Sequence, residues 1–265
     1  MRPISLLYHD VVTGEAAASG FTGADADAYK LDAANFAAHL ERIALVTSSR
    51  VQLVTPAAHF NDAGRPVLLT FDDGGVSADA LTARLLEARG WRGHFFIVTE
   101  KIDEPGFLTG RQIRDLYRRG HHIGSHSHTH PRRFSDLSYD EMLTEWRESR
   151  RILTNILGEA PFSVSVPGGF YSTEVARAAR ETGYRVLFNS EPSSRIRYES
   201  DLIVLGRYGI KRNTAPIDAE VLARGHLAPR VRQASLWNMK KPLKKVGGPV
   251  WFAARRWFFK YGNTQ

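Results

Sequence analysis

Cysteine is absent from this chain of 265 residues. Disulfide bridges and thiolate metal ligands are therefore excluded, and any bound metal would have to be held by His, Asp or Glu. No window approaches the roughly 18 apolar residues of a membrane span, and the first ten residues lack the apolar core of a signal peptide. These absences lead us to expect a soluble, cytoplasmic protein.

Acidic residues are absent after Glu220, which distributes the net charge of +8 unevenly. Lys and Arg occur ten times between Arg224 and Lys260, so residues 1–220 carry a charge of about −2. The body of the chain is thus not basic, and no nucleic-acid partner is expected. We expect a main domain over residues 1–220 and a basic, aromatic extension over residues 221–265.

The extension interleaves aromatic and cationic side chains. If Val250 to Tyr261 is helical, one broad face is apolar and carries Val250, Trp251, Ala254, Trp257, Phe258 and Tyr261. Such a helix is typical of the interface of an anionic membrane, so we expect peripheral membrane contact. Packing of this face on the main domain or on a second subunit is the alternative, and the sequence leaves the oligomeric state open.

Strand-like and helix-like segments alternate through the body of the chain. The predicted strands cover residues 66–71, 94–99, 163–166 and 185–189, and the predicted helices cover residues 77–89, 109–120, 138–158 and 172–182. Two helices begin with capping boxes, at Thr109 and Ser138. The alternation favours parallel βα units, hence an open α/β sheet or a (β/α) barrel. In both, reactive groups gather at the carboxyl ends of the strands.

Two short segments about fifty residues apart carry reactive side chains. Asp72 and Asp73 follow the predicted strand 66–71, and His126 and His130 follow a second apolar stretch. Two imidazoles and the Asp73 carboxylate would form a metal site with open positions for water and substrate. The metal would lower the pKa of water, and Asp72 would take the water proton. Either segment alone could be an ordinary turn, but both together at strand ends favour a hydrolytic site.

These segments resemble the first two motifs of the polysaccharide deacetylases, the NodB-homology enzymes of carbohydrate esterase family 4. The resemblance covers roughly residues 1–210 and rests on Thr70-Phe71-Asp72-Asp73-Gly74 and His126-Ser127-x-x-His130. It implies a distorted (β/α) barrel of seven to eight parallel βα units and metal-dependent removal of an acyl group from an N-acylated sugar. It also implies that Asp72 is the general base and that Asp73, His126 and His130 hold the metal.

The third motif of the family departs from its usual form. It usually reads Arg-x-Pro-aromatic-Gly, with an Arg that orients the base, but Ser165 stands at the Arg position, before Pro167-Gly168-Gly169. The resemblance implies that a backbone N–H near Gly168 contributes to the oxyanion hole, which requires no side chain. A late motif that supplies an acidic His is missing, because residues 203–214 contain no His.

The N-terminal segment offers a replacement for that histidine. Leu6-Leu7-Tyr8-His9-Asp10-Val11 resembles the first strand of the circularly permuted poly-N-acetylglucosamine deacetylases, where an early His is thought to protonate the leaving amine. We therefore expect His9 to be the general acid, with its pKa tuned by Asp10 or another acid. The alternative is a structural role for His9. Histidines without a partner pattern are expected to be structural: His39, His59, His94, His121 and His122.

Together these features predict a hydrolase that removes an acetyl or other small acyl group from an N-acylated sugar, in a glycan or a lipid-linked glycan precursor. Zinc is the expected metal, with cobalt, nickel or iron as alternatives. Two other functions stay open. One is a non-catalytic glycan-binding protein of the same fold, and the other is a different amide hydrolase, such as a deformylase of lipid-linked aminosugars or an allantoinase-like enzyme.

Overall fold

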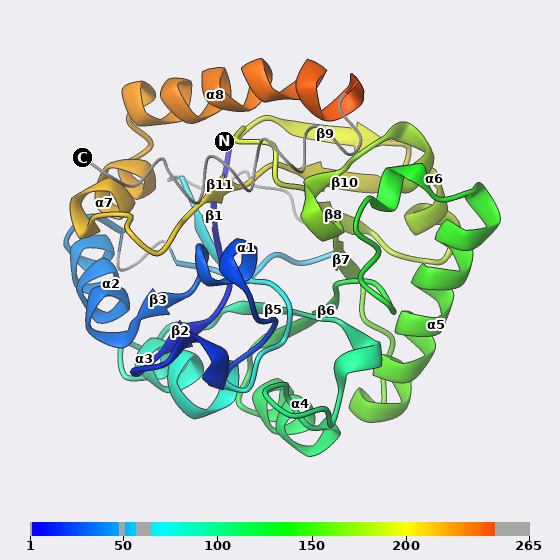
Figure 1. Ribbon diagram of the computed structural model, residues 1–265, viewed down its shortest axis with the longest axis horizontal. Coiled ribbons are helices and arrows are strands. Elements are labelled where there is room, and N and C mark those ends of the chain that lie inside the picture. Colours follow the sequence, from blue (N-terminus) through cyan, green and yellow to red (C-terminus); the bar gives the residue numbers. More distant parts are fainter. Residues whose placement is uncertain (1, 48–50, 57–64, 247–265) are drawn as a thin grey trace.

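The strands form one curled sheet against which the helices pack (Figure 1). The computed structural model describes residues 2–47, 51–56 and 65–246. Within these residues the main sheet has nine strands, in the order β11 (Tyr208–Gly209), β1 (Ile4–Tyr8), β4 (Val67–Phe71), β5 (His94–Ile97), β6 (His122–Ser125), β7 (Ser163–Ser165), β8 (Val186–Phe188), β10 (Leu202–Leu205) and β9 (Ile196–Glu199). A small second sheet pairs β2 (Val11–Val12) with β3 (Leu31–Asp32).

All neighbouring strands of the main sheet are parallel, except β9, which pairs antiparallel with β10. The described sheet therefore contains eight adjacent parallel strands. This arrangement confirms the distorted (β/α) barrel that the sequence predicted.

The sheet curls because one continuous stretch of chain contributes strands at both ends of the strand order. β10 pairs with β8 and β11 pairs with β1, while only Gly206 and Arg207 separate β10 from β11. The two sides of the sheet meet at these two residues, which we call the seam. A Cβ on Gly206 would lie 2.3 Å from the carbonyl oxygen of Glu191, so a glycine is needed for this close approach.

The described helices include those that the sequence predicted. They are α1 (Ala24–Asp27), α2 (Ala33–Thr47), α3 (Arg84–Glu87, preceded by the π-helical segment Ala78–Ala83), α4 (Gly110–Arg118), α5 (Tyr139–Leu157), α6 (Thr173–Glu181), α7 (Pro216–Arg224) and α8 (Leu227–Val246). Both predicted capping boxes form, at Thr109 and Ser138. Short 3-10 segments cover Ala16–Ala18, Thr99–Lys101, Phe134–Asp136 and Pro167–Gly169.

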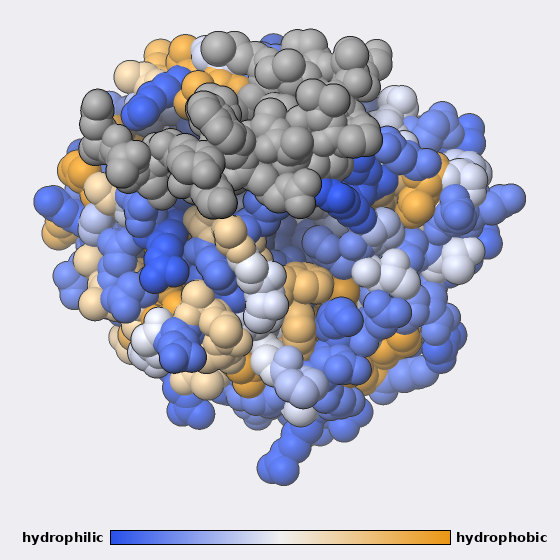
Figure 2. Space-filling view, in the orientation of Figure 1, coloured by the Kyte–Doolittle hydropathy of each residue, from blue (hydrophilic) through white to orange (hydrophobic). Residues whose placement is uncertain are grey.

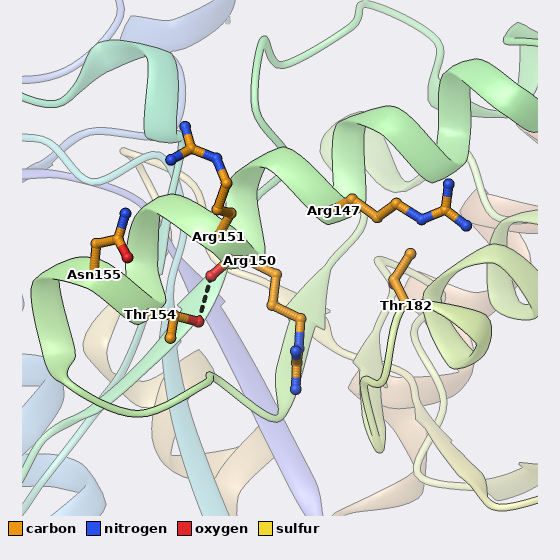
Figure 3. Close-up of a pocket in the computed structure, with 6 residues that line it drawn as sticks. All are labelled: Arg147, Arg150, Arg151, Thr154, Asn155 and Thr182. Atoms are coloured by element: carbon orange, nitrogen blue, oxygen red, sulfur yellow. Dashed lines mark hydrogen bonds between the residues drawn. The ribbon is translucent and has the colours of Figure 1, made fainter.

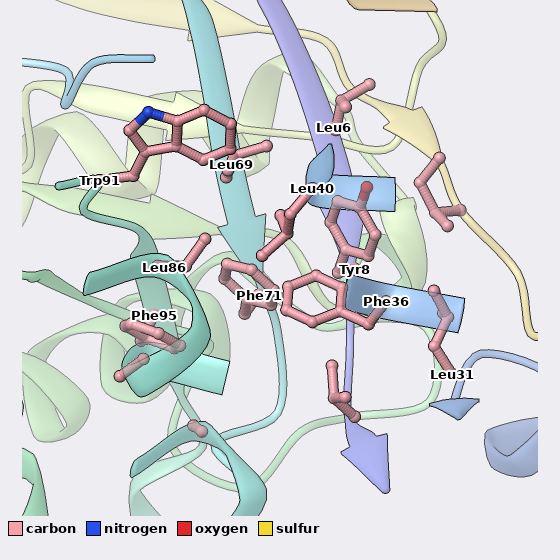
Figure 4. Packing of buried hydrophobic residues seen from close by; sticks show 14 of the residues in the cluster. Leu6, Tyr8, Leu31, Phe36, Leu40, Leu69, Phe71, Leu86, Trp91 and Phe95 are labelled. Atoms are coloured by element: carbon pink, nitrogen blue, oxygen red, sulfur yellow. The ribbon is translucent and has the colours of Figure 1, made fainter. Parts of the chain in front are cut away.

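A cluster of aromatic rings fills the space between the sheet and the helices α2 and α3 (Figure 4). Tyr8, Phe71 and Phe95 lie side by side in register on three neighbouring strands. Their ring centroids are 5.4 Å apart between Tyr8 and Phe71 and 5.0 Å apart between Phe71 and Phe95. Because side chains alternate between the two faces of a strand, His9 and Asp72 follow these aromatics onto the opposite face.

Buried histidines outside the predicted site have structural partners. The Nδ1 atom of His94 lies 3.0 Å from the carbonyl oxygen of Leu69, and its Nε2 accepts a hydrogen bond of 2.9 Å from the N–H of Val54. His121 lies 2.8 Å from a carboxylate oxygen of Glu87. These contacts agree with the structural role expected for both residues, whereas His59 lies outside the described residues.

The C-terminal helices attach to the barrel in different ways. α7 runs across residue 220, the predicted end of the main domain, and its Leu222 and Ala223 are buried in the same cluster as α2. α8 lies along the outside of the barrel (Figure 1), held by hydrogen bonds such as the one from Gln233 Nε2 to the carbonyl oxygen of Gly209. The predicted helix Val250–Tyr261 lies outside the described residues. None of the described helices has the length and apolar character needed to cross a bilayer.

Candidate functional site

The predicted site residues come together at the carboxyl ends of neighbouring strands. His9 follows β1, Asp72 and Asp73 follow β4, and His126 follows β6. Gly168 lies just beyond β7. Because these strands are parallel and only β5 lies between them, segments more than a hundred residues apart in sequence meet at one edge of the barrel.

Asp73, His126 and His130 form a compact set of groups that could hold a metal ion. Oδ1 of Asp73 lies 3.5 Å from Nε2 of His126 and 3.7 Å from Nε2 of His130, and the three ligand atoms lie within 4.8 Å of one another. Nδ1 of His126 lies 2.9 Å from the carbonyl oxygen of Ser165. This carbonyl requires a proton on Nδ1, which leaves the Nε2 lone pair directed at the site. One oxygen and two imidazole nitrogens at this spacing fit a divalent cation.

The protonation states suit metal binding. Burial lowers the pKa of His126 to about 3 and also lowers the pKa of His130, so both imidazoles are neutral at pH 7. Burial, together with the nearby Asp72 carboxylate, raises the pKa of Asp73 to about 7. A bound cation reverses this effect, because it stabilises the ionised carboxylate.

The backbone of the metal-binding segments is held in an unusual conformation. Asp73, Ser127 and His130 have positive φ angles of 77°, 67° and 58°. Such conformations cost of order 1–3 kcal/mol each for residues other than glycine. Side chains fix them: Ser127 Oγ accepts a hydrogen bond of 3.1 Å from the N–H of His130, and Glu145 accepts one of 2.9 Å from the N–H of His128. The ligands are therefore placed by a structured loop.

His128 lies between the two histidine ligands but takes a different direction. Its Nδ1 atom lies 3.0 Å from Oγ1 of Thr99, and it does not belong to the metal-binding set. This imidazole is therefore not one of the candidate ligands.

Arg207, which the sequence analysis did not identify, is the partner of the predicted base. Its guanidinium donates to both carboxylate oxygens of Asp72, at 2.7 and 2.8 Å, and both side chains are almost completely buried. Burial by itself would raise the pKa of Asp72, but the charge of Arg207 holds this pKa well below its usual range. Asp72 is thus an ionised carboxylate fixed in one orientation.

Ser165 completes this arrangement from the position where the family usually has Arg. Its Oγ accepts a hydrogen bond of 2.8 Å from Arg207 and donates one of 3.0 Å to Asp72. The orienting guanidinium is therefore present, but it comes from the seam rather than from the third motif. The signal in the sequence was a single Arg two residues after the apolar run Leu202–Leu205, separated from it only by Gly206.

His9 follows Tyr8 at the end of β1, and Asp72 follows Phe71, the residue paired with Tyr8 on the neighbouring strand β4. The Nδ1 atom of His9 is buried and has no hydrogen-bond partner among the described residues. Its ring lies 4.8 Å from the ring of Tyr29. Asp10, the suggested tuning acid, accepts hydrogen bonds of 2.6 and 2.8 Å from Ser19 and Ser77 instead.

The glycines of the third motif provide the remaining polar backbone groups. Gly168 and Gly169 have φ angles of 60° and 67°. The N–H of Gly169 donates to the carbonyl oxygen of Val166 at 3.1 Å, whereas the N–H of Gly168 has no partner among the described residues. A Cβ on Gly169 would lie 2.5 Å from Cβ of Ser190, so this tight turn requires glycine.

Replacing Arg207 with Ala should destabilise the protein by about 3–5 kcal/mol at pH 7, because it leaves a buried carboxylate without its partner. Because Arg207 depresses the pKa of Asp72, its stabilisation is present above the ordinary carboxylate pKa of about 3.9 and is lost as the pH falls below it. The difference between wild type and variant in urea-induced unfolding should therefore be larger at pH 7 than at pH 3.

Arg185 provides the matched control, because it forms an exposed ion pair of 3.5 Å with Asp201. Arg185→Ala should change the free energy of unfolding by less than about 1 kcal/mol. Equal losses for the two variants, or a pH-independent loss for Arg207→Ala, would contradict the role assigned to the buried pair.

Comparisons with known proteins agree with this geometry. Residues 60–187 match the sequence model of the polysaccharide deacetylase family. YxkH of Bacillus subtilis (strain 168), which carries a provisional polysaccharide deacetylase name, is 28% identical over 128 residues, 48% of this chain and 46% of YxkH. The match thus spans less than half the length of this curated relative.

Solved structures cover more of the chain. The deacetylase PplD of Streptococcus pyogenes, in complex with acetate, has a TM-score of 0.68 at 18% identity, over 82% of this chain and 96% of PplD. IcaB from Ammonifex degensii has a TM-score of 0.68 at 19% identity, over 84% of this chain and 97% of IcaB. These likenesses establish the fold. Residues 60–187 match the polysaccharide deacetylase family, which is the family that the motifs around Asp72 and His126 predicted.

Proposed function

We propose that this protein is a metal-dependent N-deacetylase that removes an acetyl or other small acyl group from an N-acylated sugar in a glycan or glycan precursor. One observation carries the proposal: a fitting set of metal-binding groups, Asp73, His126 and His130, lies beside the Asp72 carboxylate, which Arg207 keeps ionised. A metal site alone would serve binding or structure. A fixed, ionised carboxylate next to it is what hydrolysis of an amide requires.

Different residues of the chain have different roles in the proposed reaction. When bound by Asp73, His126 and His130, a divalent cation, for which zinc is the best candidate, polarises the amide carbonyl and makes a water molecule more acidic. Asp72 then takes the proton of the attacking water. Arg207 and Ser165 hold Asp72 in one orientation, so that no reorganisation is needed when the proton moves.

Gly168 and His9 would act on the oxyanion and on the leaving amine, respectively. The N–H of Gly168, which has no partner among the described residues, would donate to the oxyanion. His9 would protonate the leaving amine, a role that suits a buried imidazole with an unpartnered nitrogen. A glycan-binding protein would need neither an ionised base nor a free proton donor, so catalysis is favoured over binding alone.

Replacing Asp72 with Asn should lower acetate release from N-acetylated oligosaccharides by about 10²–10⁴-fold, because the amide cannot take a proton. Replacing His9 with Asn should cause a similar loss on these amides. The two variants should differ on 4-nitrophenyl acetate, whose leaving group needs no proton: His9→Asn should retain this activity, and Asp72→Asn should not.

Asp201→Asn, at an exposed acid far along the chain, is the control and should retain both activities. Release of formate instead of acetate from a panel of N-acylated sugars would favour the deformylase alternative. Absence of both products from the wild-type protein would favour the non-catalytic alternative.

Purified protein should contain one divalent metal ion per chain, which a chelator removes together with the activity. His126→Ala should abolish metal binding, because it removes a buried ligand from the set. His128→Ala should retain the ion, because this neighbouring imidazole is directed at Thr99. Elemental analysis of the three proteins measures the ion and identifies it, and equal metal content in both variants would refute the proposed ligand set.

We further propose that the protein works at a membrane surface, on a lipid-linked glycan precursor. The support is the sequence after Glu220, which carries ten cations, no acid and a cluster of aromatic residues. Leu227 and Val231 on α8, within this segment, are exposed and add apolar area to it.

Full-length protein should float with vesicles that contain an anionic phospholipid, and a chain ending at residue 246 should not. The reason is that the deleted segment holds most of the aromatic and several of the cationic residues of the extension. Neutral vesicles serve as the control for charge. Equal flotation of both chains with anionic vesicles would count against membrane contact through this segment.

A further inference from the structure

A pocket of about 310 Å³ opens beside the seam, outside the metal-binding set. The loop between β8 and β9 forms one wall, and the first turns of α8 form another. Gly206 and Tyr208 line its floor. The pocket thus lies where the two sides of the barrel join.

The lining of this pocket is strongly basic. Four arginines border it, namely Arg2, Arg195, Arg197 and Arg230, whereas Glu191 is the only acidic residue in its lining. Glu191 is already engaged, since it accepts a hydrogen bond of 2.9 Å from Arg197. The other three guanidinium groups therefore bring positive charge to the pocket without an acidic partner in its lining.

Arg230 is held in place by neutral groups. Its Nε donates to the Tyr208 hydroxyl at 2.7 Å, and its other hydrogen bonds go to the carbonyl oxygen of Gly225 and to Ser194 Oγ. These bonds position the guanidinium without cancelling its charge. Because a guanidinium has five N–H donors, two remain for a ligand. Arg2 and Arg195 are exposed, and their side chains form no hydrogen bond or ion pair among the described residues.

The pocket also borders the backbone that carries Arg207. Gly206 and Tyr208, which line it, flank Arg207, whose guanidinium holds Asp72. The N–H of Arg207 donates to the carbonyl oxygen of Glu191 at 2.9 Å. A ligand in the pocket would therefore lie against the backbone on either side of Arg207.

One wall is apolar. Leu227 and Val231 lie one helical turn apart on α8, and 71% and 57% of their surfaces remain exposed. Hydrophobic side chains gather along this end of α8 in the space-filling view (Figure 2). A border of arginines beside an exposed apolar wall fits a ligand that joins an anionic group to an apolar portion.

We propose that this seam pocket binds a phosphate or diphosphate group attached to the glycan substrate. A phosphate presents several oxygens in different directions and can accept from three separate guanidinium groups, whereas a single Arg satisfies a carboxylate. The inference rests on the proposed function, in that it assigns the phosphate to the substrate of the same site. It selects phosphorylated glycans, such as sugars linked to a lipid phosphate, over neutral polymers.

A second arginine-rich pocket, of about 220 Å³, provides a comparison (Figure 3). It lies on α5, where Arg147, Arg150 and Arg151 point outward from one helix. Arg151 is paired with Glu148, and Thr154 Oγ1 donates to the carbonyl oxygen of Arg150 at 2.7 Å, within the helix. This pocket does not adjoin the catalytic residues, so its Arg147 serves as a control for the general effect of removing a surface charge.

The test is the binding of N-acetylglucosamine 1-phosphate and of N-acetylglucosamine to the metal-free, full-length protein, measured by calorimetry or NMR titration. The phosphorylated sugar should bind more tightly, and the difference should shrink with added salt. The double variant Arg2→Ala/Arg195→Ala should weaken its binding by about tenfold or more. Arg195→Lys should restore part of the loss, and Arg147→Ala should bind as the wild type does.

Equal affinity for the two sugars, or unchanged affinity in the double variant, would overturn the proposal. A third ligand, the same sugar on a polyprenyl phosphate in detergent, distinguishes the sources. If Leu227→Ser weakens only this ligand, the phosphate belongs to a lipid carrier; if it weakens none, the phosphate is that of a soluble glycan. Acetate release is assayed separately on a neutral oligosaccharide. Activity without phosphate binding overturns only the pocket, and phosphate binding without any acetate release overturns the proposed function.

Discussion

The ion pair between Arg207 and Asp72 connects the architecture of this protein to its chemistry. A carboxylate buried to this extent is unfavourable unless an opposite charge and hydrogen bonds replace the lost water. Arg207 supplies both, and it does so from the seam, where the strand that pairs with β8 continues into the strand that pairs with β1. The residue at which the two sides of the sheet meet therefore also fixes the orientation of Asp72. Because burying two ions contributes little net stability, the main effect of the pair is on the orientation and charge of Asp72.

Strands position some of the groups around the site, and constrained loops position the others. The strands bring Asp72 and Ser165 into register, so these side chains need no unusual backbone. The metal-binding residues Asp73 and His130 lie just beyond the strands and adopt left-handed conformations that local hydrogen bonds maintain. The packed core beneath the site offsets the energetic cost of those conformations. In this core, Tyr8, Phe71 and Phe95 lie in adjacent strands. The geometry of the site therefore depends on the packing of this core.

Local patterns in the sequence predicted the elements well, and they predicted that Asp73, His126 and His130 would lie together. The capping boxes at Thr109 and Ser138, and the apolar runs before Asp72, depend on residues that are close in sequence, so short-range rules apply to them. Arg207 could not be found in this way, because its partner lies 135 residues earlier and the contact exists only once the sheet has curled. Ser165 was recognised as a departure from the motif, but its bridging role depends on that same contact. Charge likewise placed a boundary at residue 220, although α7 continues across it, since charge reports solvent exposure rather than helix packing.

The position of Arg207 near the end of the barrel has a consequence for the order in which the protein matures. During synthesis from the N-terminus, Asp73, His126 and His130 leave the ribosome well before residue 207 does. The residues of the candidate ligand set are thus present on a chain that still lacks the partner of Asp72. Asp72 acquires its fixed orientation only when Arg207 has been made and β10 and β11 have paired with the rest of the sheet. A chain that stopped before residue 207 would therefore carry the three candidate ligands without an oriented base.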